Sequence, residues 1–270
     1  MNWILAGCGV VEWSNMRWMI LLALWPLPVA GQYSLYSCMV TSKGYVVGAK
    51  LPPSGIFVKA SGGGWRHAGF NHPFVNALDF DPRDPDTLYV AAGNGLMRVT
   101  EHGERWKLLT GSDVTELLDV AVDRNAPGTM YFTHSAGIRA THDGGATWTD
   151  VSAGLHRKYS QAIRVDSRQA GVLVAGNEEG IFRSQDGGKS WKLAGASGYQ
   201  VLHIEQSPHD ACHWLAASEG GGLFASTVCG VTFEKQWQSR RGPEYLRHCL
   251  RPRLTQSHRR RRLGNRRGAL

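Results

Sequence analysis

One twelve-residue pattern recurs along this chain at a nearly constant interval, and this regularity restricts its fold more than any other feature. The clearest copy, Gly180 to Trp191, reads Gly-Ile-Phe-Arg-Ser-Gln-Asp-Gly-Gly-Lys-Ser-Trp, and Gly137 to Trp148 repeats its spacing. Degenerate copies occupy Gly95 to Trp106, Gly222 to Phe233 and the shorter Gly55 to Trp65. The opening glycines lie 40, 42, 43 and 42 residues apart, which independent loops have no reason to share. The chain is therefore a tandem repeat.

The segments between the copies have the composition of short β-strands separated by turns. Before each of the last four copies, two runs rich in apolar residues flank a cluster of Pro, Asp, Asn or Ser. These runs are Val75–Phe80 and Leu88–Ala92, Leu118–Val122 and Met130–Thr133, Ala162–Val165 and Val172–Ala175, and Val201–Ile204 and His213–Ala217. Four antiparallel strands in about 42 residues are typical of a propeller blade. We therefore predict an all-β fold, a β-propeller of four-stranded antiparallel blades, with about five blades visible and the ring incomplete.

The residues at the tip of the pattern, which we call the box, have a structural interpretation. The Asp carboxylate can accept hydrogen bonds from turn amides, the preceding hydroxyl can bond nearby backbone, and the glycine supplies a positive φ. The Trp is expected to anchor the turn on its own blade and to cover the seam between sheets. Box carboxylates of different blades would lie too far apart on the rim to share a substrate. The residues concerned are Ser184, Asp186, Gly188, Ser190 and Trp191, and Thr141, Asp143, Gly145, Thr147 and Trp148.

The spacing S-x-D-x-G-x-[ST]-W, with Thr in the opening place of one copy, resembles the Asp-box or BNR repeat family. The resemblance covers roughly residues 40 to 237. The resemblance implies a propeller fold. It is a weak indicator of function, because sialidases, xyloglucan hydrolases, sortilin-type receptors and photosystem II assembly factors share the motif. The short loops of this chain are closest to the photosystem II assembly-factor type. Members usually close with six to eight blades or more, so five visible copies imply an incomplete ring; five-bladed closure is the alternative.

The first 31 residues are interpreted as an N-terminal extension and export signal. Met16-Arg17 precedes the apolar run Trp18 to Val29, and Val29-Ala30-Gly31 places small residues before Gln32, as at a cleavage site. The run is short for a membrane span, which favours a cleaved signal. The first alternative is an uncleaved anchor, which would be the only route by which this chain attaches to a membrane. A third interpretation is a segment of the core. Translation starts at Met1 or at Met16. The predicted location is therefore periplasmic or extracellular.

The last 32 residues, 239–270, differ in character from the predicted propeller of residues 32–238. They contain 11 Arg and one Glu. Because the whole chain carries a formal charge of +8, residues 1–238 sum to −2 and are nearly neutral. We predict an out-of-frame segment or, alternatively, a genuine basic disordered tail that binds acidic surfaces. A basic surface on the propeller itself is excluded, and no nucleic-acid partner is expected.

Two segments are predicted to face a ligand, because propeller ligands usually bind where loops between second and third strands meet the inter-blade linkers. Glu178 and Glu179 lie in such a loop, and His156, Arg157 and Tyr159 lie in a linker. Solvated polar loops are the alternative for both segments.

Two other acidic residues, Asp79 and Asp81, are candidates for the carboxylate pair of a glycoside hydrolase. A turn-forming role is preferred, because Asp123 and Asp166 occupy the same place as Asp81 in their repeats.

No catalytic residue, metal ligand or cofactor site is assigned from the sequence. It has no phosphate-binding glycine loop, zinc spacing or nucleophile elbow. We expect a non-catalytic exported propeller that binds a protein or glycan or scaffolds assembly. The alternative is a fragment of a glycoside hydrolase, sialidase-like or xyloglucanase-like, whose catalytic residues are missing or unrecognised. The sequence has no Arg-Ile-Pro element, which argues against a sialidase.

Two of the five cysteines meet in the last repeat, where Val228 replaces the box Asp. Cys229 lies in that turn and Cys212 opens the second strand of the same unit, so both should face one region of the blade. A disulfide would restore the constraint that the Asp supplies elsewhere. The preferred interpretation is nevertheless that both are unpaired small residues, because a bridge requires Cα atoms within about 7 Å of each other.

Overall fold

The chain folds into five antiparallel sheets that follow one another in sequence, as the prediction of an all-β propeller requires. The computed structural model describes residues 7–13, 16–26, 33–39, 53–60, 63–72 and 74–237. In these residues the one helical element is the 3₁₀ turn η1 (Glu101–Gly103). Within each sheet, hydrogen-bonded neighbours are also consecutive along the chain.

The sheets define five blades. Blade 1 contains β1 (Gly7–Trp13), β2 (Met16–Pro26), β3 (Tyr33–Met39), β4 (Gly55–Ala60) and β5 (Trp65–Ala68). Blade 2 contains β6 (Val75–Asp81), β7 (Asp84–Ala92), β8 (Gly95–Thr100) and β9 (Arg105–Leu108). Blade 3 contains β10 (Asp119–Val122), β11 (Met130–His134), β12 (Gly137–Thr141) and β13 (Thr149–Asp150). Blade 4 contains β14 (Ser160–Val165), β15 (Leu173–Asn177), β16 (Ile181–Ser184) and β17 (Lys192–Gly195), and blade 5 contains β18 (Val201–Gln206), β19 (Trp214–Ser218), β20 (Gly222–Ser226) and β21 (Glu234–Trp237).

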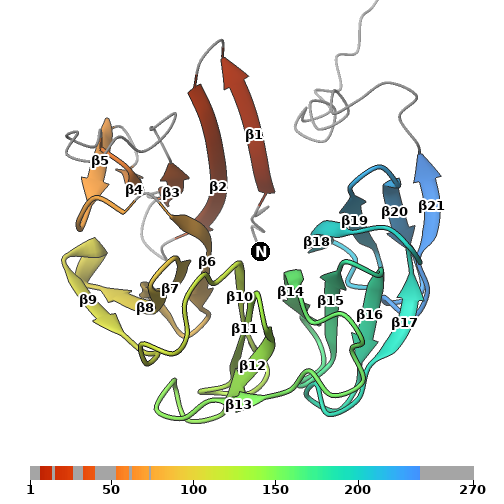
Figure 1. The fold of residues 1–270 in the computed structure, drawn as a ribbon. Coiled ribbons are helices and arrows are strands. Elements are labelled where there is room, and N and C mark those ends of the chain that lie inside the picture. The colour runs from red at the N-terminus through yellow and green to blue at the C-terminus, as the bar shows by residue number, and fades with distance from the viewer. Residues whose placement is uncertain are drawn as a thin grey trace, which may run out of the picture.

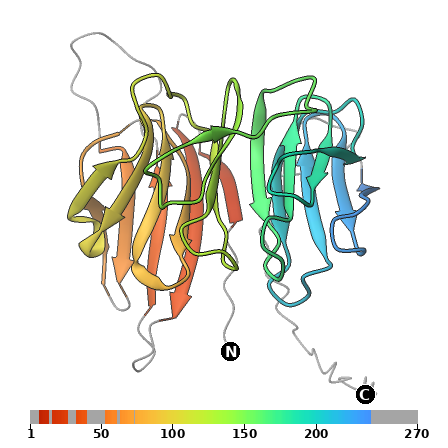
Figure 2. The ribbon, with the colours of Figure 1, turned by 90° about the horizontal axis from the view of Figure 1, so that it is seen from below.

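The blades form an arc around a common centre (Figure 1). The first strands of blades 2 to 5 lie on the inner side and the fourth strands on the outer rim. Contacts between β6 and β10, β10 and β14, and β14 and β18 join successive blades. The arc is open between blade 5 and blade 1. Figure 2 shows the sheets from the side, with their strands running between two ends of the molecule.

Blade 1 differs from the predicted four-stranded unit. It has five strands, because β1 pairs with the inner edge of β2. The apolar run that was interpreted as an export signal supplies most of β2, which pairs with β3 through Ala23–Tyr36 and Leu24–Leu35. Export itself stays a prediction. The cleavage site after Gly31 and the tail 239–270 lie outside the described residues.

The core is divided among the seams between blades, because each blade buries its faces against its neighbours. One equivalent position of the second strand shows this: Tyr89, Tyr131 and Val174 are 5%, 1% and 0% exposed. The equivalent Leu215 of blade 5 is 55% exposed, because no described sheet follows it. Position in the arc, not residue type, decides the burial.

The two complete boxes contain the hydrogen bonds expected of their residues. In blade 4, Asp186 Oδ1 accepts from Ser184 Oγ at 2.8 Å and from Ser190 N at 2.9 Å, and Asp186 Oδ2 accepts from Ser190 Oγ at 2.6 Å. Ser184 Oγ in turn accepts from Gly188 N at 2.9 Å. Thr141, Asp143, Gly145 and Thr147 repeat these bonds in blade 3.

The box tryptophans correct one sequence-based expectation. The Trp148 indole donates to Leu109 O at 3.1 Å, and the Trp191 indole donates to Val151 O at 2.8 Å. Both acceptors follow the last strand of the preceding blade. The prediction that these rings anchor the box on its own blade was wrong, whereas the prediction that they cover the seams is confirmed. The reason is geometric: the box extends past its own sheet edge, so the nearest unpaired carbonyl belongs to the neighbour.

Acid should weaken the box turns of blades 3 and 4. Hydrogen bonds from the Ser190 side chain and backbone and from Ser184 lower the pKa of Asp186 to about 2, and bonds from Thr141 and Thr147 also lower the pKa of Asp143. In the unfolded chain an Asp titrates near about 3.9. The unfolded state therefore takes up protons first, and the stabilisation present above about pH 4 is lost as the pH falls toward 2.

Thermal unfolding at pH values between 5 and 2 tests this expectation. In Asp186→Asn, the melting temperature should be lower at pH 5 and should fall less steeply with acid than in the parent. Glu219→Gln, at an exposed position, is the control that should keep the parent's pH profile. If the melting temperature of Asp186→Asn fell with acid as steeply as that of the parent, the stabilising role of the ionised Asp186 would be contradicted.

The last box is closed by a disulfide between Cys212 and Cys229, 17 residues apart in the sequence. The expectation of two unpaired cysteines is therefore wrong, and the structure has the disulfide that was the alternative. Ser226 Oγ accepts from Gly230 N at 3.1 Å, as the hydroxyls of the complete boxes do, but Val228 supplies no carboxylate. The covalent bond thus constrains a turn in which this acceptor is missing.

Candidate functional site

A hollow of about 780 Å³ is lined by residues of blade 4 and of the linkers that precede and follow it. Its volume is within the range of small-molecule sites. Four of the five residues predicted to face a ligand line it: His156 and Arg157 from the linker after β13, and Glu178 and Glu179 from the loop between β15 and β16. The other lining residues are Gly154, Phe182, Trp191, Leu193, Ser197 and Gly198.

A buried amide, Asn177, holds the two polar segments of this first hollow together. Its Oδ1 accepts from Glu179 N at 2.8 Å and from Gly180 N at 3.1 Å, while its Nδ2 donates to Arg157 O at 2.7 Å. Asn177 is 1% exposed, so these bonds fix the loop against the linker. The sequence analysis did not select Asn177. The signal was available, because an Asn at the end of a second strand commonly bonds the turn that follows it.

The first hollow presents charged groups of both signs over an apolar base. Arg157 Nη1 lies 3.8 Å from Glu178 Oε2, and both side chains are well exposed. The aromatic rings of Phe182 and Trp191 are almost fully buried below them. The arrangement can donate and accept hydrogen bonds to a polar ligand that also has an apolar face. Both carboxylates come from one loop, and the neighbouring segment carries cations.

The fifth predicted residue, Tyr159, lies elsewhere. It lines a second hollow of about 450 Å³ with residues from blades 2 and 3 and their linkers. These are His72, Phe74, Asn76, Gly93, Asn94, Glu116, Leu118 and Ser135. The linker that carries His156 and Arg157 therefore contributes to two sites, because Tyr159 comes just before β14 and lies nearer the centre of the arc.

The acidic residues considered for hydrolysis are engaged in structural bonds. Asp81 Oδ1 accepts from Arg83 N at 3.0 Å, which is the preferred turn-forming role. Asp79 Oδ2 instead accepts from Val122 N of blade 3 at 2.8 Å, so Asp79 links two blades. Burial raises the pKa of the Asp79 carboxyl, and Arg124 opposes this effect.

A charged cluster on the inner strands was not predicted. Arg164 Nη1 lies 2.6 Å from Asp119 Oδ2, and Arg164 Nε lies 3.4 Å from Glu205 Oε2. His203 Nε2 lies 3.5 Å from the same Glu205 oxygen. Asp119 also accepts from Ile163 N at 2.9 Å. These bonds occupy the carboxylates, so the cluster joins blades 3, 4 and 5 and offers no free acid.

The described residues contain neither a cluster of metal-binding side chains nor a membrane-spanning helix. No group of three or more His, Cys, Asp or Glu side chains in that part of the chain is arranged to hold a metal ion. No helix among the same residues has the length and apolar character needed to cross a membrane.

Comparisons with known proteins agree with the fold. No family model matches the chain. It is 29% identical to a xyloglucanase of Paenibacillus sp. in an alignment that covers 58% of this chain and 20% of that enzyme. It is 24% identical to an oligoxyloglucan-reducing end-specific xyloglucanase of Emericella nidulans, over 69% of this chain and 32% of that enzyme. The crystal structure of an ancestral GH74 enzyme superposes with a TM-score of 0.52 at 18% identity, covering 61% of this chain and 25% of that one.

These similarities are partial in length. The chain spans 20% and 32% of the two curated relatives that it matches. At this identity, the structural similarity shows the fold alone. With the five antiparallel sheets and their arrangement in an arc, it establishes that the chain has a β-propeller fold whose ring is incomplete in the described residues.

Proposed function

We propose that this chain is an exported, non-catalytic β-propeller unit that binds a glycan in the first hollow. The observation that carries the proposal is the composition of that hollow, where His156 and Arg157 face Glu178 and Glu179 over the buried Phe182 and Trp191. Hydroxyl groups of a sugar both donate and accept hydrogen bonds, and sugar rings have apolar faces. A hollow with donors, acceptors and an apolar base suits such a ligand.

The placement of the carboxylates favours binding over hydrolysis. A glycosidase needs two carboxyl groups that flank the scissile bond. Glu178 and Glu179 are consecutive residues of one loop, and the adjoining segment supplies Arg157, 3.8 Å from Glu178.

Two further observations support the glycan and the export. Both curated relatives are named xyloglucanases, so a xyloglucan-type polysaccharide is the first ligand to test. The Cys212–Cys229 disulfide suits an oxidising compartment outside the cytoplasm.

The second candidate function is that of a glycoside hydrolase fragment whose remaining catalytic groups lie beyond the described blades. The names of the relatives and the short coverage of their length favour it. It differs from the first proposal in one measurable respect, because a hydrolase releases new reducing ends.

Titration of xyloglucan oligosaccharides into the full chain, followed by calorimetry, tests the binding site. Glu178→Gln and Arg157→Met should each weaken binding roughly tenfold, since a hydrogen bond to a charged group contributes about 1.5 to 3 kcal/mol. Glu219→Gln is the matched control, because Glu219 occupies the same loop position in blade 5 outside the hollow. Asp186→Ala, at the other end of β16, should also leave the affinity unchanged.

Equal affinity in all four variants would place the ligand elsewhere, and absence of binding to any oligosaccharide would reject the glycan proposal. Release of reducing ends that Glu178→Gln abolishes would favour the hydrolase instead.

A further inference from the structure

The disulfide of blade 5 occupies a place that blades 3 and 4 give to glycine. In blades 3 and 4, one backbone hydrogen bond joins the box turn to the turn between the first two strands. The bonds are Gly144 N to Gly128 O at 2.9 Å, Gly187 N to Gly171 O at 2.9 Å and, in blade 5, Cys229 N to Cys212 O at 3.1 Å. Both glycines of the pair are thus cysteines in blade 5, where Val228 replaces the box Asp.

Cysteine is an unfavourable residue at the second of these positions. Cys229 has φ +58°, and the equivalent Gly144 and Gly187 both have φ +74°. This left-handed region favours glycine, because a Cβ approaches the following carbonyl. The bond to Cys212 therefore holds Cys229 in a conformation that a released cysteine has reason to leave.

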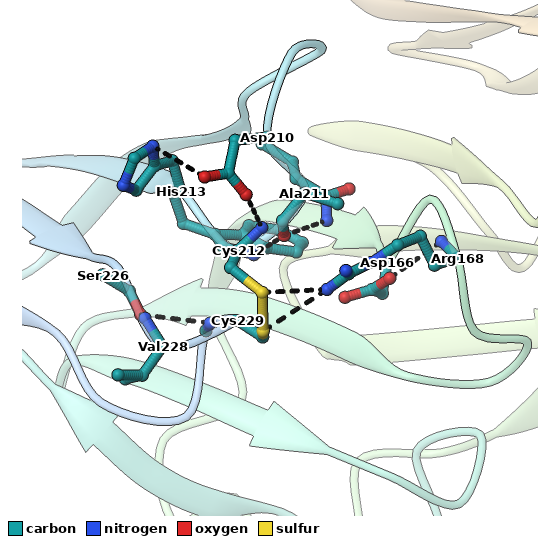
Figure 3. The surroundings of a disulfide bond; sticks show 12 residues. Asp166, Arg168, Asp210, Ala211, Cys212, His213, Ser226, Val228 and Cys229 are labelled. Atoms are coloured by element: carbon teal, nitrogen blue, oxygen red, sulfur yellow. Dashed lines mark hydrogen bonds and ion pairs between the residues drawn. A yellow bond between two sulfur atoms is a disulfide. The ribbon is translucent and has the colours of Figure 1, made fainter.

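A cation from the neighbouring blade lies against both sulfur atoms (Figure 3). Arg168 Nη2 is 3.0 Å from Cys212 Sγ and 3.3 Å from Cys229 Sγ. Arg168 comes from the turn between β14 and β15, where its backbone N donates to Asp166 Oδ1 at 2.8 Å. No described carboxylate forms an ion pair with its guanidinium. Both cysteines are partly exposed, so a small molecule can reach them.

We propose that Cys212–Cys229 is a thiol–disulfide exchange site for a small monothiol, with Arg168 stabilising the departing thiolate. The incoming thiolate attacks Cys229 Sγ and forms a mixed disulfide, while the Cys212–Cys229 bond breaks and its electron pair leaves on Cys212 Sγ. A second thiolate attacks the outer sulfur of the mixed disulfide, which gives the dithiol protein and the oxidised small disulfide. Two thiols are oxidised and one protein disulfide is reduced, and solvent supplies the protons that the cysteine thiolates take up.

The geometry sets the order of these steps. Arg168 is nearer to Cys212, and a nearby cation lowers the pKa of a thiol and makes it a better leaving group. Release of Cys229 removes the covalent constraint on the last box, which then retains only the Ser226 hydroxyl and backbone bonds. Exchange would thus destabilise the last box of blade 5 and leave the first hollow unchanged.

Reduction of the full chain by glutathione, quenched with acid and mapped by peptide mass spectrometry, tests the proposal. The mapping separates Cys212 and Cys229 from the other three cysteines. The mixed disulfide should accumulate on Cys229. Arg168→Asn should slow reduction roughly threefold for each unit by which the leaving thiol's pKa rises. Asn is the residue at this turn position in blade 3, where Asn125 N donates to Asp123 Oδ1 at 2.8 Å, so the variant keeps the turn.

Two controls separate charge from fold. Arg168→Lys should keep the parent rate within a factor of two, and Arg83→Asn, at the same turn position of blade 2, should leave it unchanged. The pH dependence of iodoacetamide alkylation in the reduced protein measures the pKa of the Cys212 thiol. This pKa should lie below about 8.5 in the parent and should be higher in Arg168→Asn. An unchanged rate and thiol pKa in Arg168→Asn, or glutathione found on Cys212 rather than Cys229, would overturn the assignment.

Discussion

Asp119→Ala should be among the most destabilising single substitutions in this protein, costing about 3 to 5 kcal/mol of unfolding free energy. Asp119 and Arg164 form the shortest ion pair between blades, with side chains 7% and 17% exposed. Removing the carboxylate leaves the guanidinium largely buried, with Glu205 at 3.4 Å as its remaining ion-pair partner and Ile163 O at 2.7 Å as a hydrogen-bond acceptor. It also removes the acceptor of Ile163 N. Urea unfolding followed by circular dichroism gives the free energy.

The repeat supplies a control for this experiment. The positions equivalent to Asp119 in blades 2 and 4 are Ala77 and Ala162, and the position equivalent to Arg164 in blade 3 is Ala121, so the repeat accommodates Ala at both positions. The double variant Asp119→Ala/Arg164→Ala should therefore recover at least half of the loss, because no unpaired charge remains. If the double variant were as unstable as Asp119→Ala, the loss of unfolding free energy would come from packing and not from the unpaired charge of Arg164.

Replacing both bridging cysteines by alanine should lower the stability of blade 5 by about 3 kcal/mol in the chain-entropy account of a disulfide. Cys212 and Cys229 are 17 residues apart, and their bond is the only covalent link across the last box. Hydrogen exchange of the amides of residues 212–237 should accelerate accordingly, while exchange in blade 3 should stay as in the parent.

The matched variant is Cys212→Gly/Cys229→Gly, which installs the glycine pair of blades 3 and 4. It should recover roughly 1 kcal/mol relative to the alanine pair, because glycine accepts the left-handed backbone at position 229. If the glycine pair proved no more stable than the alanine pair, the strain attributed to Cys229 would be absent.

The sequence predicted the strands of blades 2 to 5 to within a few residues, since each property of the repeat is local. Predicted runs such as Met130–Thr133 and Ala162–Val165 fall inside β11 (Met130–His134) and β14 (Ser160–Val165). The box bonds of Asp186 and the turn role of Asp81 follow from neighbours within four residues. Short-range hydrogen-bonding chemistry is readable in a single sequence.

Long-range features could not be predicted in the same way. The pairing of β2 with β3 joins an apolar run, whose composition also fits an export signal, to a strand beyond it, and no periodic pattern marks that pairing. The ion pair of Asp119 with Arg164 spans two blades and depends on the stagger between their inner strands. The same holds for Trp191, whose acceptor Val151 O lies 40 residues upstream. Knowing that a residue faces inward does not identify its partner on another sheet.

Two sets of hydrogen bonds between blades share one direction along the chain, whereas others, such as Ser167 N to Gln206 Oε1, run the opposite way. The acceptors Asp79, Asp119 and Asp123 lie in earlier blades and bind backbone amides of the next blade. The carbonyls of Leu109 and Val151 likewise receive the indoles of the tryptophans that come later. A blade that leaves the ribosome therefore already carries the acceptors on which its successor docks. Such a chain can assemble in the order of its synthesis, with each new sheet templated by the one made before it.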